Sequence, residues 1–152
     1  MQVKLKKYIS SDLIFADLAK LPKEEFITAF INRIYSKRPE LPAEEIALAV
    51  LAREEKETTA IGGGIAFPHC RLDSIDTITV AVGVCKDGID YGAPDKKPVH
   101  LVIAIFGPNS RSDEYLYLLG QIARFMSDRK RTERIIAAGD SAYIYKELKS
   151  VV

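Results

Sequence analysis

The segment VHLVIAIFGP (residues 99–108) is apolar at nearly every position, and it constrains the fold of this chain more than any other feature. A strand with apolar residues on both faces is stable only when both faces are covered. Helical patterns lie before and after it, so helices are available for each side. The order is two helices, three or four strands, and three helices, which fits neither strict strand–helix alternation nor an all-β fold. We therefore expect an α/β protein with a compact sheet that has helices on both faces.

Two amphipathic helices are predicted before the sheet. In the first, PKEEFITAFINRIYSK, Pro22 suits the first helical position, and apolar residues recur at helical spacing from Phe26 to Ile34. Pro39 ends this helix, and Pro42 opens the second, PAEEIALAVLAREEK, in the same way. Three helices follow the sheet, and the residues expected to begin or end them are Ser112 or Asp113, Ser127, Gly139, and Asp140 or Ser141.

The middle of the chain has the pattern of strands. Residues 77–85 (TITVAVGVC) alternate large apolar residues with smaller ones, as a strand with one face in the core does. A turn-rich connection, KDGIDYGAPDKKP, follows, and within it we consider a short edge strand over residues 89–91. The earlier stretch TTAIGGGIAFPH (58–69) is β-prone but interrupted by glycines, so any strands in it must be brief.

Length and composition limit the classes of function. Residues 1–152 fit a single domain with a real core, and no linker or repeat divides them. The net charge of +1 gives no overall field for nucleic acid, and no apolar stretch is long enough for membrane insertion. No signal-peptide pattern opens the chain, so we expect a cytoplasmic location with Cys70 and Cys85 reduced. The glycines at 62–64 match no nucleotide-binding motif, and ligand spacing for a metal is lacking, so we expect no cofactor and no metal.

The ten residues GGGIAFPHCR (62–71) surround His69, one of the two histidines of the chain. Glycines let another molecule approach the backbone closely, Pro68 fixes the backbone just before the imidazole, and Arg71 can pair with an anion. These local features support a functional and a structural role for His69 equally. The other histidine, His100, begins the buried strand without such surroundings, which favours a structural role at the border of the sheet.

The chemistry open to His69 is that of a nucleophile. A neutral imidazole attacks well when one ring nitrogen is held by a hydrogen bond and the other is free. Phosphorus is a suitable target, because the resulting phosphoramidate stays reactive and the group can be passed on. Backbone N–H groups of the glycine turn and one or two arginines would stabilise the transferring oxygens.

Three stretches together resemble one known family. TTAIGGGIAFPHCR (58–71) resembles the active-site signature of the type-2 (fructose/mannitol-type) IIA proteins of the bacterial sugar phosphotransferase system, and more narrowly that of their nitrogen-regulatory branch. LAREEKETT (51–59) is similar to the family's Arg-Glu segment, and IDYGAPDKKPVHLVIAIFGP (89–108) is similar to its segment that leads into a buried strand. The resemblance extends in order over nearly the whole chain.

This resemblance implies a three-layer α/β/α sandwich with a small mixed sheet flanked by helices, and a histidine that is phosphorylated. That histidine would be His69, the active-site arginine would be Arg53, and Thr59 would be the hydroxyl residue near the phosphorylated ring. A small histidine-phosphorylated carrier protein would be the donor, docking on an apolar patch around His69. The acceptor would be a downstream regulatory protein in the nitrogen branch, or a IIB component in transport members.

One position departs from the family pattern. The family has a second histidine early in the helix after the buried strand, where this chain has Tyr115. A tyrosine can donate a hydrogen bond to a phosphoryl oxygen, but it does not become cationic near neutral pH. Our principal hypothesis is a phosphohistidine carrier and regulator of the nitrogen-regulatory type, which accepts and donates a phosphoryl group rather than working as an independent enzyme. A sugar-specific transport component, and a binding module whose phosphotransfer Tyr115 impairs, are the alternatives.

Overall fold

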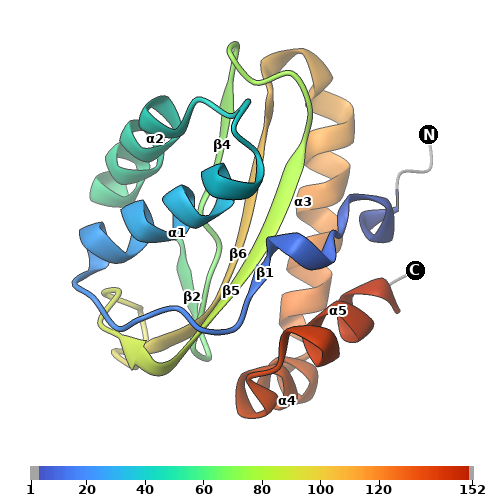
Figure 1. Cartoon of the computed structure of the whole chain (residues 1–152). Coiled ribbons are helices and arrows are strands. Elements are labelled where there is room, and N and C mark those ends of the chain that lie inside the picture. Colours follow the sequence, from blue (N-terminus) through green and yellow to red (C-terminus); the bar gives the residue numbers. More distant parts are fainter. Residues whose placement is uncertain (1–3, 151–152) are drawn as a thin grey trace.

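The computed structural model describes residues 4–150, and in it helices cover both faces of one sheet (Figure 1). The helices are α1 (Lys23–Lys37), α2 (Ala43–Lys56), α3 (Ser112–Ser127), α4 (Arg129–Ala138) and α5 (Ser141–Lys149). The strands are β1 (Ile14–Phe15), β2 (Ala60–Gly62), β3 (Ile65–Ala66), β4 (His69–Leu72), β5 (Thr79–Ile89) and β6 (Val99–Pro108). Short 3-10 helices are η1 (Leu5–Tyr8), η2 (Ser11–Leu13) and η3 (Asn109–Arg111). The protein is an α/β, three-layer α/β/α sandwich, as predicted.

The six-stranded sheet is mixed, as the family resemblance implied. Its order is β1-β5-β6-β3-β2, and β4 also pairs with β6. The long strands β5 and β6 are antiparallel, whereas β1 runs parallel to β5, and β3 and β4 run parallel to β6. β3 and β4 lie one after the other along β6, beside residues 101–102 and 105–108 respectively. This arrangement places the start of β4 beside the second half of the most buried strand.

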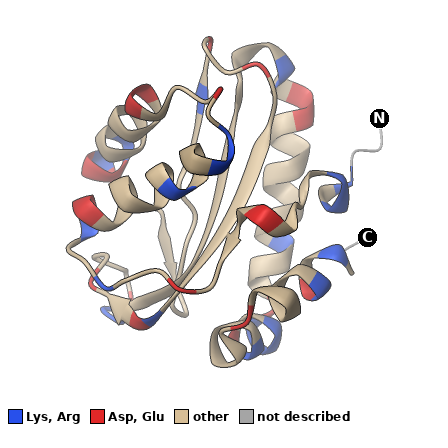
Figure 2. Ribbon diagram, in the orientation of Figure 1, with Lys and Arg blue, Asp and Glu red and all other residues tan. Residues whose placement is uncertain are grey.

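β6 is buried on both faces, as its composition requires. Its alternate side chains enter two separate cores: Leu101, Ile103 and Ile105 face the layer of α3, α4 and α5, and Val102, Ala104 and Phe106 face the layer of α1 and α2. Figure 2 shows most of the charged residues on the helices and connections, and none on β6. The sheet therefore separates two apolar layers, each closed by its own helices.

The helix boundaries agree with the predictions to within a few residues. Pro22 and Pro42 lie just before α1 and α2, and their carbonyls accept hydrogen bonds from the N–H groups of Phe26 and Ile46, at 2.8 and 3.0 Å. Gly139 closes α4 in the left-handed conformation that glycine favours, as predicted.

Two predicted helix N-caps are wrong. α4 is capped by Asp128, whose carboxylate accepts from the N–H of Arg131 at 3.1 Å, whereas the Ser127 hydroxyl bonds within the end of α3. α3 begins at Ser112 and has no side-chain cap, because the Ser112 hydroxyl donates to the carbonyl of Asn109. At α4 a neighbouring residue takes the role, and at α3 the hydroxyl bonds to a nearby backbone carbonyl instead.

Two strands differ from the prediction. β5 continues to Ile89, which pairs with Val99 after a bulge, and Tyr91 is fully buried, so the edge strand considered over residues 89–91 is wrong. β1 has no counterpart in the prediction, because a strand of two residues after a 3-10 turn shows no periodicity. It nevertheless extends the sheet by pairing with Val82 and Gly83.

Gly83 lies in the middle of β5, where a side chain has no room. A Cβ atom there would overlap Leu18 Cδ1 and lie 3.1 Å from Phe30 Cε1, and both residues are buried. We expect Gly83→Ala to lower the free energy of unfolding by about 1–3 kcal/mol, measured by urea denaturation, because an overpacked core must shift. Gly120→Ala is the control: its Cβ would meet nothing within 4 Å, and alanine favours the helix. An equal loss of stability in both variants would contradict this explanation.

Candidate functional site

His69 is the first residue of β4, and it lies beside Ile105 of β6. Its Nδ1 is 2.8 Å from the carbonyl oxygen of Phe67. Because a carbonyl only accepts hydrogen bonds, Nδ1 carries the proton and Nε2 keeps its lone pair. The Phe67 ring also packs near the imidazole, with the two ring centroids 5.1 Å apart. The half-buried ring is therefore held in one tautomer, with Nε2 as its nucleophilic nitrogen.

His69 and Arg71 project from the same face of β4, because alternate residues of a strand share a face. Ile105, the neighbour of His69, belongs to the core on the side of α3. The Arg71 guanidinium lies on that side too, 5.3 Å from the centroid of the Tyr115 ring, and its Nη1 donates to Ser112 Oγ at 2.7 Å. The structure thus brings a cation and Tyr115 to the side of the sheet that His69 faces.

Tyr115 has an unusual hydroxyl group. The residue is 3% exposed, and its hydroxyl is buried without a hydrogen-bond partner among the described residues. Burial raises the pKa of the phenol above its ordinary value of 10; the Cys70 thiol acts in the same direction, and Arg71 opposes it. Tyr115 is therefore a neutral hydrogen-bond donor at neutral pH. A buried hydroxyl that lacks a partner costs about 1–3 kcal/mol, a cost that a polar ligand would remove.

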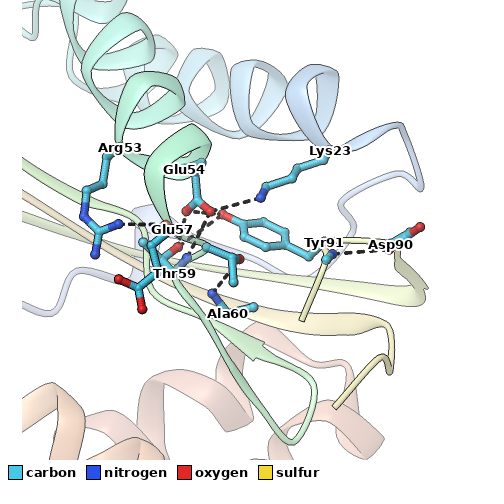
Figure 3. A network of polar contacts seen from close by, with 10 residues as sticks. Lys23, Arg53, Glu54, Glu57, Thr59, Ala60, Asp90 and Tyr91 are labelled. Carbon is cyan, nitrogen blue, oxygen red and sulfur yellow. Dashed lines mark hydrogen bonds and ion pairs between the residues drawn. The ribbon is translucent and has the colours of Figure 1, made fainter. Parts of the chain in front are cut away.

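The other two predicted site residues, Arg53 and Thr59, come from α2 and from the segment that follows it (Figure 3). Arg53 Nη1 donates to the carbonyl of Glu57 at 2.7 Å, and the Thr59 hydroxyl donates to the carboxylate of Glu54. Within residues 4–150, no hydrogen bond or ion pair connects Arg53, Thr59 or Tyr115 to the imidazole of His69. The role of each residue toward a phosphoryl group stays a prediction.

Glu54 is the centre of a buried polar network, and it is not among the residues predicted for the site (Figure 3). Its carboxylate accepts hydrogen bonds from the N–H of Thr59 and from the Tyr91 hydroxyl, each at 3.0 Å, and it pairs with Lys23 Nζ at 3.1 Å. Burial acts to raise the pKa of the Glu54 carboxyl, but Thr59 and Lys23 outweigh it and hold the pKa below the ordinary 4.5. Glu54 is therefore an ionised group inside the protein at neutral pH.

A signal for Glu54 is present in the sequence. It continues the stripe of Ile46 and Val50 along α2 at a spacing of four residues, and both of these are buried. A carboxylate at a core position of a helix needs partners, so the position itself indicates a polar network. The partners Lys23 and Tyr91 come from α1 and from the connection after β5, and no sequence spacing indicates that they meet.

The glycine turn between β2 and β3 lies away from His69. Its three glycines (62–64) have φ values of 88°, 68° and 80°, which explains the need for glycine, and the N–H of the middle one donates to the Asp95 carboxylate at 2.9 Å. β3 begins beside Leu101, four residues along β6 from Ile105, or roughly 13 Å. The expectation that N–H groups of this turn would stabilise phosphoryl oxygens at His69 is therefore wrong.

Cys70 and His100 lie outside the arrangement around His69. Cys70 packs against the core of α1 and α2, on the opposite face of β4, and burial raises the pKa of its thiol to about 12. The His100 Nδ1 lies 3.1 Å from the carbonyl oxygens of both Cys85 and Lys86, so its ring holds the bulged end of β5. This geometry supports the structural role expected for His100.

In the part of the chain from residue 4 to residue 150, no helix combines the length and the apolar character that crossing a membrane requires. The same residues contain no cluster of three or more histidine, cysteine, aspartate or glutamate side chains that could hold a metal ion.

Comparison with known proteins agrees with this fold and with the sequence stretches around His69. Residues 7–151 match the family described as phosphoenolpyruvate-dependent sugar phosphotransferase system, EIIA 2. The chain belongs to this family, and the resemblance drawn from the sequence is confirmed.

Its relatives include regulatory and sugar-specific proteins. The chain is 31% identical over 124 residues to a nitrogen regulatory protein of Pseudomonas aeruginosa, covering 82% of this chain and 80% of the relative. It is 32% identical over 104 residues to a fructose-specific EIIA component of Haloferax volcanii, covering 68% of each.

Solved structures share the fold at lower identity. The nitrogen regulatory protein IIA-Ntr from Neisseria meningitidis has a TM-score of 0.85 at 22% identity, over 95% of this chain and 98% of the other. A complex of enzyme IIAMtl with phosphorylated enzyme IIBMtl from Escherichia coli contains a chain with a TM-score of 0.78 at 22% identity, over 92% and 96% of the two chains.

Proposed function

We propose that this chain is a phosphohistidine carrier and regulator of the phosphotransferase system, in which Nε2 of His69 accepts a phosphoryl group from a small histidine-phosphorylated carrier protein. The observation that carries the proposal is the hydrogen bond from Nδ1–H of His69 to the Phe67 carbonyl, because it leaves Nε2 with its lone pair. The nitrogen regulatory relatives support a regulatory protein as the downstream partner. We propose that the chain acts in the cytoplasm and as one domain over residues 1–152.

The transfer needs no further reactant. Nε2 attacks phosphorus in line with the N–P bond of the donor, a new N–P bond forms on His69, and the electron pair of the broken bond returns to the donor's ring nitrogen. We propose that the proton on Nδ1 stays in place, because Nδ1 takes no part in the transfer and its hydrogen bond to the Phe67 carbonyl does not have to break. The same steps in reverse pass the phosphoryl group to the next protein.

Two residues on the face of His69 are proposed to stabilise the transferring oxygens. Arg71 supplies positive charge, and its guanidinium is already held at the start of α3 by Ser112. Tyr115 supplies a hydroxyl that has no hydrogen-bond partner within residues 4–150, so a phosphoryl oxygen is a partner that it gains.

Two residues on the α2 side are proposed to complete the site. Arg53 would exchange the carbonyl of Glu57 for a phosphoryl oxygen when the donor docks, since its side chain is only partly buried. Thr59 already donates its hydroxyl to Glu54, and its carbonyl accepts from the N–H of Phe67 at 3.0 Å. We therefore propose that Thr59 mainly supports the segment that leads to His69.

The test is phosphorylation of the purified chain by a complete donor system with phosphoenolpyruvate. We expect an acid-labile phosphoryl adduct in the wild type, detected by mass spectrometry, and none in His69→Ala, because the variant lacks the accepting nitrogen. The matched control is His100→Ala, which removes the other histidine and should still be phosphorylated. An adduct of equal amount in His69→Ala would refute the assignment.

A sugar-specific transport component is the second candidate, because the fructose-specific relative is as similar to this chain as the nitrogen regulatory one. The fate of the phosphoryl group on the phosphorylated chain distinguishes the transport component from the regulator. Rapid transfer from His69 to a fructose or mannitol IIB component would favour transport, and retention of the phosphoryl group would favour regulation.

A further inference from the structure

The buried carboxylate of Glu54 connects to His69 through backbone hydrogen bonds. Glu54 Oε1 accepts from the N–H of Thr59 at 3.0 Å, the Thr59 carbonyl accepts from the N–H of Phe67 at 3.0 Å, and the Phe67 carbonyl accepts from Nδ1 of His69 at 2.8 Å. In each of these three bonds the N–H group donates toward the Glu54 end of the series. The N–H and the carbonyl of Thr59 belong to two different peptide groups, as do those of Phe67, so the series acts by fixing the position of each residue in turn.

The carboxylate itself is held firmly at its end of the series. Lys23 pairs with it at 3.1 Å and also lies 4.5 Å from the centroid of the Tyr91 ring, while the Tyr91 hydroxyl donates to the other carboxylate oxygen (Figure 3). Tyr91 is fully buried and Glu54 is 7% exposed, so the cluster has little freedom to move. α1, α2 and the connection after β5 thus all contribute to one fixed acceptor.

From this series we infer that Glu54 is a positioning residue for His69: it fixes the peptide of Thr59, and through Phe67 it selects the Nδ1–H tautomer that leaves Nε2 free. The inference rests on the proposed function in that Nε2 is the accepting nitrogen. It adds a residue that touches neither the phosphoryl group nor the imidazole. The hydrogen bond made by one ring nitrogen sets the tautomer of a histidine, so a residue that fixes the acceptor of that bond acts on the tautomer indirectly.

The experiment reads the tautomer directly, without any phosphoryl donor. Long-range proton–nitrogen NMR correlations at a pH where both histidines are neutral distinguish Nδ1–H from Nε2–H, and the chain has two histidines only. We expect the wild-type His69 to be in the Nδ1–H form, and we expect Glu54→Gln to shift it to a mixture of both tautomers. Phosphoryl uptake should slow in proportion to the lost Nδ1–H fraction.

Two controls accompany the measurement. His100 is an internal one, because its Nδ1 contacts the carbonyls of Cys85 and Lys86 and should keep its spectrum in Glu54→Gln. Glu55→Gln removes the same charge from the exposed neighbour on α2 and should leave His69 unchanged. A His69 that keeps the Nδ1–H form in Glu54→Gln overturns the inference, as does an equal change at His100, which would indicate general loosening.

If Glu54→Gln does not fold, the same NMR measurement of the His69 tautomer is made on Tyr91→Phe. It removes one donor from the carboxylate and leaves Lys23 and Thr59 in place, so we expect a smaller shift of His69 in the same direction, and an unchanged spectrum overturns the inference. The two failures are distinguishable. A wild type that takes up no phosphoryl group refutes the proposed function, while the tautomer result still decides the role of Glu54.

Discussion

Tyr115→Phe is expected to slow phosphoryl uptake by His69 on the order of 100-fold, the effect typical of removing one donor to a transferring oxyanion. The same variant should be as stable as the wild type or more stable by about 1 kcal/mol, because the hydroxyl that it lacks is buried and finds no hydrogen-bond partner among the residues that the structure describes. Phosphorylation time courses and urea denaturation measure the two effects. Activity and stability should thus change in opposite directions.

Tyr117→Phe is the matched control for this experiment. It makes the same chemical change two residues away on α3, at a side chain that is 44% exposed, and should alter neither rate nor stability. An unchanged rate in Tyr115→Phe would show that the hydroxyl does not reach the phosphoryl group. In the same assay, a large rate gain in Tyr115→His would favour the impaired binding module, and no gain would favour the carrier.

Glu54→Ala is expected to lower the free energy of unfolding by about 1–3 kcal/mol at neutral pH, the loss typical when a buried hydrogen-bonding group is left without its partner. The Tyr91 hydroxyl and the Thr59 N–H would lose their acceptor, and Lys23 would lose its counter-ion. Urea denaturation measures the difference. Glu55→Ala on the exposed side of α2 is the control and should cost far less; equal losses would contradict the network.

The cost of Glu54→Ala should also depend on pH. The pKa of Glu54 in the folded protein is below its unfolded value of 4.5, so the carboxylate contributes its full stability above about pH 4.5. As the pH falls through the lower, folded pKa, this contribution is lost. Denaturation curves of the wild type and the variant should therefore converge in acid, and a difference that grows as the pH falls would refute the stated direction.

Much of the fold was predictable because it depends on periodicity. The apolar run of β6 requires cover on both faces, and the apolar stripes of α1 and α3 provide part of it. Features set by single contacts were not predictable. Whether Ser127 or Asp128 caps α4, and whether Ile14 and Phe15 pair with β5, depends on tertiary geometry rather than on local pattern.

The candidate site was predictable to a smaller extent. The resemblance pointed to His69 and Tyr115, and the structure places Tyr115 on the side of the sheet that His69 faces. The glycine turn, which is near His69 in sequence, lies beside a different part of β6, because β3 and β4 pair with β6 one after the other. Glu54 was missed because two of its partners, Lys23 and Tyr91, come from distant segments, and only its place on the buried stripe of α2 indicated a polar network.

Mutations on the two sides of the sheet are expected to have different effects in this protein. The Glu54 network, on which we expect stability to depend, lies on the side of α1 and α2, whereas Tyr115 lies on the side of α3. Position 115 can therefore be exchanged in evolution without disturbing the carboxylate cluster across the sheet. If position 115 sets the rate of the proposed transfer, a single substitution on one layer changes that rate and leaves the opposite layer intact.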